Sequence, residues 1–410
     1  MPDVVVIGGG PSGLATATAL RALGVGDVVV LERESEAGGI PRHSAHLGYG
    51  IRDLKRVLSG PGYARTLVRR AVDAGVDIRT SATATEWGEK LGVCVTSPSG
   101  RYTLDCSALV VATGCRERPR AARLVPGSRP AGVVTTGQLQ QMVHLNHQVP
   151  GRRAVVVGAE HVSYSAVMTL AEAGCSVAAM VTEQPRHTSF QAFDTAARAR
   201  WRFPVHTQAR VTDIGGRERV EWVEISHADG STEVVSCDTV VFTGDWIADH
   251  ELARRQMVDI DHRSTGVVVD TGSRSSSPGV FAVGNVVHPA ETADACSLEG
   301  QVVAQSVLSH LHGAPWPTSG VPITVAEPLS WVSPSRISDR TTPARGRFVL
   351  RGSDFRRRPT ICVSQGGHTL WQGTAPRLVP TRPLYVPSSW LSAVDLSANA
   401  APVSIELASH

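Results

Sequence analysis

Short apolar runs alternate with helical stretches in the first part of the chain. Val4–Ile7 is an apolar run, Ser12–Leu23 has a helical pattern, and Val28–Leu31 is the next apolar run. Uninterrupted apolar runs of this length predict strands that are buried on both faces. A strand–helix–strand order of this kind predicts a parallel sheet with helices on both faces.

The same pattern then returns further along the chain. Leu109–Ala112 predicts a buried strand that ends at Thr113-Gly114. A second strand–helix–strand unit follows, with elements predicted at Ala154–Val157, Ser163–Gly174, Val177–Val181 and Thr239–Phe242. One more buried strand is predicted at Gly279–Gly284 and a helix at Leu298–Leu311. The chain therefore contains two similar units in tandem.

The texture of the sequence changes after His312. Prolines become frequent, and short β-like runs occur at Phe348–Leu350, Thr360–Ser364 and Thr369–Gln372. We expect Gly313–His410 to be a separate, mainly β module. Trp331, Trp371 and Trp390 are interpreted most simply as its core, and a dimer or partner surface is the alternative.

A glycine-rich turn joins the first strand to the first helix. Gly8 permits a tight turn, Gly10 lets the backbone approach a pyrophosphate, and Gly13 lets the helix pack on the strand. The amides at the start of the helix can then donate to phosphates. Glu32 ends the next strand, where a carboxylate accepts both ribose hydroxyls and repels a 2′-phosphate. These features together predict a dinucleotide site.

Composition narrows the class of protein. The apolar fraction is 42% and the charged fraction 19%, which is ordinary for a globular chain of 410 residues in two or three domains. A formal charge of +3 with scattered basic residues argues against a nucleic-acid partner. No apolar run approaches the roughly 20 residues that span a bilayer. Because Met1-Pro2-Asp3 leads directly into a strand without a basic leader, we expect a cytoplasmic protein.

The cysteines do not form a redox or disulfide framework. Seven are spread along the chain, and no two have C-x-x-C spacing. This indicates a reducing compartment and removes the disulfide of a disulfide reductase. His43 and His46 form a close pair without an accompanying Cys or carboxylate, so we expect no metal site.

The sequence resembles the two-dinucleotide-binding-domain flavoproteins. The resemblance rests on Glu32 and on the motifs at residues 8–13, 38–39, 112–114 and 278–285. The resemblance covers about residues 1–312. It implies an α/β fold with two nested Rossmann-like domains: a discontinuous FAD-binding domain at 1–121 and 266–312, an NAD(P)-binding-like domain at 122–265, and the C-terminal β-rich module at 313–410. In that superfamily an Asp holds the FAD ribityl chain where this sequence has Asn285. The resemblance places FAD against Gly8, Gly10, Pro11, Ser12, Gly13, Glu32, Arg33, Gly39, Ile40, Thr113, Gly114, Gly284, Asn285 and Ala295.

The stretches 38–43 and 112–119 narrow the resemblance. They look like the large subunits of opine oxidase, hydroxyproline dehydrogenase, sarcosine oxidase and hydrogen cyanide synthase, which oxidise amines and imino acids. In that fold the segments 40–46 and 288–300 flank the flavin ring. Arg42 would then pair with a substrate carboxylate, and His43 would assist proton removal. A cofactor-holding or packing role is the alternative for both, and His288 and Glu291 are further candidates.

The second glycine motif is incomplete. Residues 158–163 retain Gly158, but Glu160 and Ser163 replace the second and third glycines. Glu160 would place a negative charge where the pyrophosphate of a nucleotide comes closest. Two such charges about 5 Å apart at a dielectric near 20 repel by about 3 kcal/mol, which lowers nucleotide affinity on the order of a hundredfold. Glu183, at the end of this unit's second strand, could still hold a ribose. The sequence therefore leaves NAD(P)H use open.

The sequence as a whole predicts an FAD-dependent dehydrogenase or oxidase that acts on a C–N bond. It would work with a partner subunit or electron acceptor and would form an oligomer. One alternative is an NAD(P)H-dependent reductase that passes electrons to a partner or small molecule. Another is a flavoprotein scaffold whose catalysis lies in a partner subunit.

Overall fold

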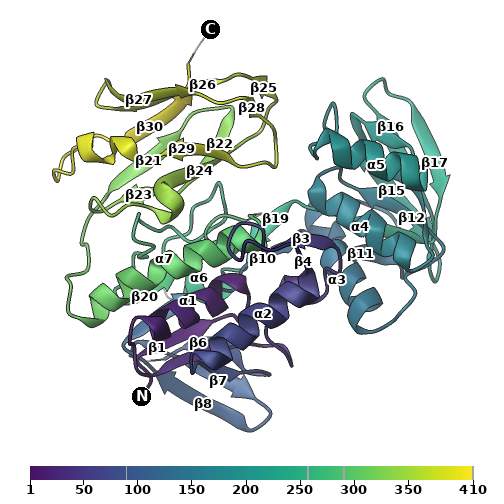
Figure 1. Ribbon diagram of the computed structural model, residues 1–410. Helices are drawn as coiled ribbons and strands as arrows, with labels where there is room; N and C mark the ends of the chain where they lie inside the picture. The colour runs from purple at the N-terminus through teal and green to yellow at the C-terminus, as the bar shows by residue number, and fades with distance from the viewer. Residues whose placement is uncertain (89, 256–257, 290, 409–410) are drawn as a thin grey trace. The chain divides into compact units, whose positions relative to one another are not determined.

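The computed structural model describes residues 1–88, 90–255, 258–289 and 291–408. Its internal contacts divide the chain into two compact units (Figure 1). Unit 1 comprises residues 1–42, 48–115 and 247–410, and unit 2 comprises residues 43–47 and 116–246. The chain enters unit 2 within β10 (Cys115–Glu117) and leaves it within β19 (Trp246–Ala248). These bounds differ from the predicted 122–265 because the stretch after Trp246 packs with unit 1.

The core of unit 1 is a five-stranded parallel sheet in the order β20-β9-β1-β2-β5. Its strands are β1 (Val4–Ile7), β2 (Val28–Leu31), β5 (Asp77–Arg79), β9 (Ala108–Val111) and β20 (Val280–Ala282). The three central strands are buried along their whole length, which explains why they read as continuous apolar runs. The α/β class predicted from the sequence is confirmed.

Helices cover one face of this sheet and a small antiparallel sheet covers the other. The helices are α1 (Pro11–Ala22), α2 (Gly60–Asp73) and α7 (Ala293–Leu311), and the sheet is β6 (Thr83–Trp87), β7 (Gly92–Ser97) and β8 (Gly100–Asp105). In Figure 1, α1 and α7 run side by side. Gly300 permits this close approach, because a Cβ there would lie 2.3 Å from the carbonyl oxygen of Ser12. Helix α7 ends at Leu311 as predicted but starts at Ala293, before the predicted start at Leu298.

Unit 2 repeats the plan. Its parallel sheet has the order β11-β18-β12-β13-β14, with β11 (Val133–Thr135), β12 (Arg153–Val157), β13 (Ser176–Thr182), β14 (Val205–Thr207) and β18 (Thr239–Phe242). The helices are α3 (Thr136–Gln140), α4 (His161–Glu172) and α5 (Gln191–Trp201). An antiparallel sheet, β15 (Ala209–Gly216), β16 (Val220–His227) and β17 (Thr232–Ser236), completes it.

The C-terminal part of unit 1 is β-rich, as predicted. One sheet has the order β23-β21-β30-β26-β27, formed by Arg336–Ile337, Val321–Val325, Val403–Leu407, Thr360–Gln365 and His368–Thr374. The other has the order β22-β24-β29, formed by Leu329–Ser333, Arg347–Gly352 and Leu384–Pro387. Trp390 lies in the core between them and Trp371 is half-buried at its edge. Trp331 is buried but lies outside this core.

Candidate functional site

The turn between β1 and α1 is shaped for close approach of a ligand backbone. Gly8 has φ +111°, and a Cβ there would lie 2.4 Å from the carbonyl oxygen of Ala112. A Cβ on Gly13 would lie 2.0 Å from the carbonyl oxygen of Gly8. A Cβ on Gly10 would meet no protein atom within 4 Å. The fold therefore requires two of these glycines, whereas the third faces open space at the helix N-terminus.

Glu32 lies beside this turn with its carboxylate held in place. Its Oε2 accepts a hydrogen bond from the Gly9 amide at 3.0 Å and its Oε1 one from the Glu34 amide at 2.9 Å. The residue is buried, and this burial raises the pKa of its carboxyl above the ordinary value, an effect that the two amides oppose. Lone pairs remain on both oxygens for a ribose diol.

These features fit FAD. The open position at Gly10 leaves room for the pyrophosphate, the α1 amides can donate to it, and Glu32 stands where the adenosine ribose belongs. Two other glycines hold the surrounding chain close. Gly39 has φ +63°, with a Cβ position 2.9 Å from Gly10 Cα, and Gly284 has φ +76°, with a Cβ position 2.6 Å from Ser12 Oγ.

Several residues that the resemblance assigned to FAD also hold the protein together at this edge of the sheet. Thr113 Oγ1 donates to the carbonyl oxygen of Asp249 at 2.6 Å, and the Gly114 carbonyl accepts from the Asp249 amide at 2.9 Å. Arg33 reaches the Asp249 carboxylate at 3.3 Å, with its side chain 65% exposed. Ile40 is exposed. We keep their cofactor contacts as predictions.

Asn285 closes the loop that leads into α7. Its Nδ2 donates to the carbonyl oxygen of Glu291 at 3.1 Å, and its Oδ1 accepts from the Glu291 amide at 2.8 Å. An ionised Asp could accept but not donate, so the amide suits this loop better than the acid of the superfamily pattern. Ala295 is buried in the first turn of α7.

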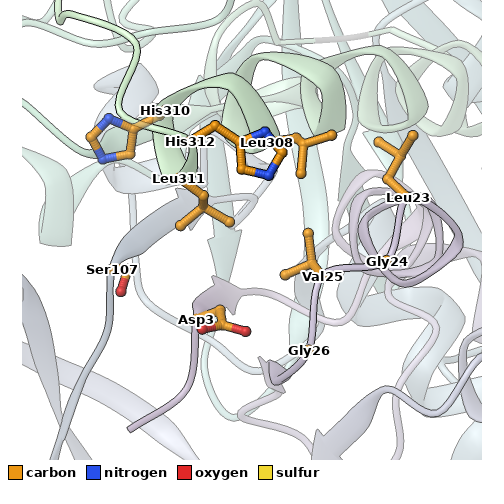
Figure 2. Close-up of a pocket in the computed structure, with 10 residues that line it drawn as sticks. All are labelled: Asp3, Leu23, Gly24, Val25, Gly26, Ser107, Leu308, His310, Leu311 and His312. Carbon is orange, nitrogen blue, oxygen red and sulfur yellow. The ribbon is translucent and has the colours of Figure 1, made fainter.

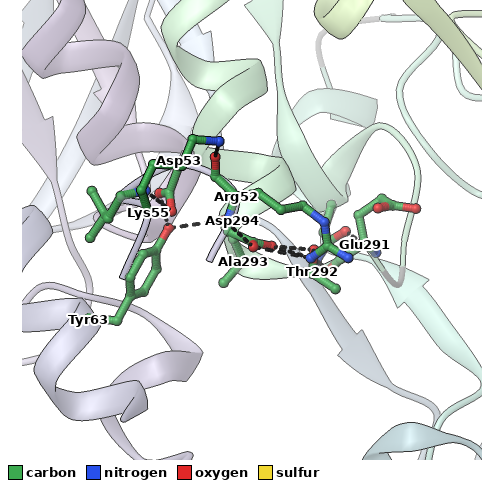
Figure 3. A network of polar contacts seen from close by, with 10 residues as sticks. Arg52, Asp53, Lys55, Tyr63, Glu291, Thr292, Ala293 and Asp294 are labelled. Carbon is green, nitrogen blue, oxygen red and sulfur yellow. Dashed lines mark hydrogen bonds and ion pairs between the residues drawn. The ribbon is translucent and has the colours of Figure 1, made fainter. Parts of the chain in front are cut away.

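A polar network surrounds the first turn of α7 (Figure 3). Asp294 Oδ1 accepts hydrogen bonds from Arg52 Nη1 at 2.9 Å and from Thr292 Oγ1 at 2.6 Å. Beside it, Tyr63 donates to Asp53 at 2.6 Å. The carboxylates face the positive end of the helix dipole, and the network fixes the loop 50–55 against the helix start.

Two buried ion pairs near this helix were not predicted as pairs. His288 Nε2 lies 3.0 Å from Glu299 Oε2, and Arg351 Nη2 lies 3.0 Å from Glu291 Oε1. Burial alone would lower the pKa of His288, but the charge and hydrogen bond of Glu299 outweigh it and raise the pKa. No local pattern could reveal Arg351, because it lies 60 residues from its partner.

The structure places both proposed catalytic residues in confined positions. The Arg42 guanidinium already contacts two carboxylates: Nη1 is 2.6 Å from Glu34 Oε2, and Nη2 is 3.4 Å from Glu36 Oε2. His43 is buried, with 3% of its surface exposed. Their approach to a substrate stays a prediction.

In unit 2, the turn before α4 is filled by its own side chain. Glu160 is the N-cap residue of α4, and its carboxylate accepts from the Ala159 amide at 3.0 Å and from Thr243 Oγ1 at 3.0 Å. A Cβ on Gly158 would lie 2.9 Å from Glu160 Oε1, and one on Gly244 would lie 1.9 Å from it. The carboxylate therefore fills the space between Gly158 and Gly244, beside the N-terminus of α4.

A buried acid, Glu117, supports this arrangement. Glu117 accepts from the amides of Gly137 at 2.9 Å and Gly244 at 3.2 Å. Arg123 Nη2 donates to the carbonyl oxygens of Thr243 and Gly244 at 2.8 and 2.9 Å. The turn at 243–244 is thus held from both sides. Glu183, the proposed ribose ligand, is exposed at the end of β13.

The buried acids of unit 2 should make stability depend on pH. Burial raises the pKa of Glu160 and of Glu117 above the ordinary value of 4.5. The folded protein therefore binds protons that the unfolded chain releases, so the contribution of these two carboxyls to stability is full below about pH 4.5 and is lost as pH rises through their raised pKa values. A tenfold change in the acid dissociation constant of one carboxyl on folding corresponds to about 1.4 kcal/mol.

Glu160→Gln should flatten that decline when the free energy of unfolding is measured in urea between pH 4.5 and 8. Glu172→Gln removes a half-exposed carboxylate from the last turn of the same helix and should retain the wild-type slope. Identical slopes in wild type and Glu160→Gln would contradict the expectation.

No disulfide joins any of the seven cysteines, all of which lie within the described residues. Burial raises the pKa of Cys106 and of Cys175 to about 12, so neither supplies a thiolate near neutral pH. We expect single Cys→Ser variants to keep wild-type flavin reduction apart from losses explained by stability. A dithiol that takes up two electrons beyond the flavin in a reductive titration would contradict this.

One group of metal-type ligands occurs among the described residues. His206 Nδ1 and His227 Nε2 each lie 3.0 Å from Glu233 Oε1, on β14, β16 and β17. The pair His43 and His46 is not part of it.

A shallow pocket of about 410 Å³ lies at the opposite edge of the first sheet (Figure 2). Asp3, Gly26 and Ser107, which come just before β1, β2 and β9, line it together with the end of α7. Ligands of such sheets bind at the carboxyl ends of the strands, so this pocket is not the cofactor site. None of the described helices is long and apolar enough to cross a membrane.

Known proteins share this architecture. The chain matches the family model of pyridine nucleotide-disulphide oxidoreductases over residues 2–305. It is 27% identical to the ferredoxin--NAD(+) reductase subunit of the benzene 1,2-dioxygenase system of Pseudomonas putida, over 85% of this chain and 83% of that protein. It is 25% identical to an opine oxidase subunit of Rhizobium meliloti, over 75% of this chain and 63% of that protein.

Among solved structures, thioredoxin reductase of Lactococcus lactis superposes with a TM-score of 0.65 at 17% identity, covering 77% of this chain and all of that one (100%). This likeness concerns the fold. With the family match and the FAD-shaped turn, it confirms the resemblance predicted from the glycine motifs. The chain belongs to the pyridine nucleotide-disulphide oxidoreductase family and is an FAD-dependent oxidoreductase.

Proposed function

We propose that this protein oxidises a C–N bond of an amine or of an amino or imino acid. The observation that carries the proposal is the Glu160 carboxylate in the turn of unit 2. Because this carboxylate occupies the pyrophosphate position, reducing equivalents come from an organic substrate rather than from NAD(P)H. The likeness to the opine oxidase subunit supports a C–N substrate.

Bound FAD would supply a two-electron acceptor. With FAD as the acceptor, a C–N bond that gave up two electrons and the proton on its nitrogen would become an imine, which water hydrolyses. The multi-component relatives suggest that a partner subunit or another acceptor would receive the electrons. We place the protein in a reducing compartment, the cytoplasm, in accord with the absence of disulfides among its described cysteines.

The proton at the substrate nitrogen needs a base. We assign this role to His43, with His288 as the second candidate, because Glu299 orients its imidazole from 3.0 Å. The Nδ1 of His288 is buried and has no hydrogen-bond partner among the residues the structure describes. The base should be the residue whose change to Ala removes a pH dependence of flavin reduction.

Anaerobic flavin reduction tests the proposal. Purified holoprotein is mixed with a panel of amines, amino acids, NADH and NADPH, and the visible flavin absorption is followed. We expect an amine or amino acid to reduce the flavin faster than either nicotinamide. Reduction by NADH or NADPH alone would overturn the proposal.

That outcome would favour a second function, NAD(P)H-dependent reduction of a partner. The likeness to the ferredoxin--NAD(+) reductase subunit and the exposed Glu183 at the end of β13 support it. If the isolated chain turned over with no donor, the scaffold alternative would apply, and activity should return when a partner subunit is added.

A further inference from the structure

One face of the sheet β22-β24-β29 carries two arginine–aromatic pairs. Side chains two residues apart on a strand share a face, so Arg347 and Arg351 of β24 point the same way. Trp331 lies opposite Arg351 in β22, and Tyr385 lies opposite Val349 in β29, which puts both rings on that face.

The first pair is complete. The Arg351 guanidinium lies over the Trp331 ring at 5.2 Å and forms its ion pair with Glu291 at 3.0 Å. Both charged side chains are almost fully buried, at 6% and 3% exposure. A carboxylate thus neutralises this arginine where the loop before α7 meets the sheet.

The second pair has no carboxylate. The Arg347 guanidinium lies over the Tyr385 ring at 3.6 Å, and the Arg345 guanidinium lies 5.9 Å from the same ring. Among the described residues, neither Arg345 nor Arg347 forms an ion pair with an acid. Arg347 Nε is buried without an acceptor. Both arginines and Tyr385 remain partly exposed, so a small ligand can reach them.

The electrostatics of this cluster favour an anion. Burial and the charge of Arg345 lower the pKa of Arg347, which shows that two cations repel here. The charge of Glu291 opposes this lowering, although the Glu291 carboxylate forms its ion pair with Arg351, at 3.0 Å. The backbone keeps Arg345 in place at φ +61°, in the left-handed region, within the turn Ala344–Gly346 that lies against α7.

We propose that Arg347, Arg345 and Tyr385 bind the carboxylate of the substrate, which makes the substrate an amino or imino acid rather than a simple amine. The inference rests on the proposed C–N oxidation. A guanidinium packed over a ring keeps a planar fork of N–H donors that matches a planar carboxylate, and the Tyr385 hydroxyl is a further donor. The β-rich module beyond the family match at residue 305 would thereby set specificity.

Arg42 is the competing carboxylate ligand. Its guanidinium is already offset by Glu34 at 2.6 Å and Glu36 at 3.4 Å, so a substrate carboxylate would meet a net negative group. Arg347 carries no such partner. The two assignments therefore predict different outcomes for one pair of variants.

The test measures binding to the holoprotein by calorimetry, without turnover. The probes are acetate, benzoate and pyrrole-2-carboxylate, with benzamide and pyrrole as neutral analogues and inorganic phosphate as the other anion. We expect a carboxylate to bind wild type, and Arg347→Gln to weaken that binding by about 10- to 100-fold. Arg347→Lys should recover part of it, because the charge remains but the fork is lost. Arg345→Gln should also weaken carboxylate binding, and it serves as the test variant in case Arg347→Gln does not fold.

One control keeps the result specific. Arg357→Gln makes the same charge change at an exposed strand position of the same module and should bind carboxylates like wild type. Weaker carboxylate binding in Arg42→Ala, with wild-type affinity in Arg347→Gln, would assign the carboxylate to Arg42 instead. The inference would be overturned if wild type bound no carboxylate, or if it bound phosphate as tightly as carboxylates. It would also be overturned if the Arg347 and Arg345 variants bound carboxylates with wild-type affinity. If amines failed to reduce the flavin, the proposed function would be contradicted, but the carboxylate-binding result could still be interpreted because it involves no turnover.

Discussion

Replacing Gly10 by Val should yield a folded protein that does not retain FAD. The protein itself tolerates a side chain at this position, because a Cβ meets nothing within 4 Å. The backbone there is extended, with φ −83° and ψ −175°, which any residue adopts. The same space must admit the pyrophosphate against the α1 amides, so the Val side chain excludes the cofactor. Flavin content is measured by absorbance, and folding by circular dichroism.

Gly13→Ala is the matched comparison. Its Cβ would lie 2.0 Å from the carbonyl oxygen of Gly8, so this variant should lose the strand–helix crossing and not only the cofactor. The flavin that heat releases from wild type should be FAD rather than FMN, since Glu32 stands where a second ribose binds. Full FAD content in Gly10→Val, or FMN in wild type, would contradict the assignment.

The first nucleotide site could be predicted because its signals are local. Val4–Ile7 and Val28–Leu31 are strands with the predicted bounds, since strands buried on both faces admit only apolar residues. Gly8 and Gly13 follow from the same geometry, because the turn leaves no room for a Cβ.

The edges of the units were harder to predict because their patterns are mixed. In β6–β8 the alternation is broken by a bulge between Ala84 and Glu86, and in β15–β17 by bulges at 211–213 and 215–216. A bulge shifts the side chains that follow to the other face, so a period of two is lost. Helix α2 begins Gly-Pro-Gly, which resembles a turn, although Tyr63, Leu67 and Ala71 lie on one buried face.

The candidate site shows the limit of local signals more clearly. Glu160 could be recognised as an obstacle from its place in the motif, but not its engagement by Thr243, which lies 83 residues away in the sequence. In the sequence, Arg347 and Arg351 only flank the apolar run Phe348–Leu350, and this local pattern assigns neither of them a partner. Their roles follow only from Glu291, Trp331 and Tyr385, which other elements bring beside them.

Both nucleotide turns depend on what occupies the helix N-terminus. At α1 the space beside Gly10 is open and its N-cap makes no side-chain hydrogen bond. At α4 the Glu160 carboxylate caps the helix, and Ser163 Oγ accepts from the Glu160 amide at 3.2 Å. An internal carboxylate thus satisfies donors that a phosphate would otherwise satisfy. The same turn is therefore open in one unit and filled by its own side chain in the other.

Wild type should therefore bind NADH weakly and be reduced by it slowly, and Glu160→Gly should improve NADH affinity by up to about a hundredfold. The Gly variant removes both the charge and the side chain that lies 1.9 Å from the Cβ position of Gly244. Glu160→Gln removes the charge alone and leaves the turn filled, so it should improve affinity less. The ratio of the two increases in NADH affinity separates the effect of charge repulsion from the effect of the space that the Glu160 side chain fills. Affinity is measured by NADH fluorescence titration, and reduction by anaerobic stopped flow.

Acidity offers an independent check on the same variants. Because burial raises the pKa of Glu160, lowering the pH protonates it and should strengthen NADH binding to wild type but not to Glu160→Gln. Glu172→Gln, at the far end of α4, should bind NADH like wild type at every pH. Tight NADH binding and rapid flavin reduction by wild type would show that the carboxylate moves out of the turn when the nucleotide arrives. The protein would then be an NAD(P)H-dependent reductase, and its organic partner would receive electrons rather than supply them.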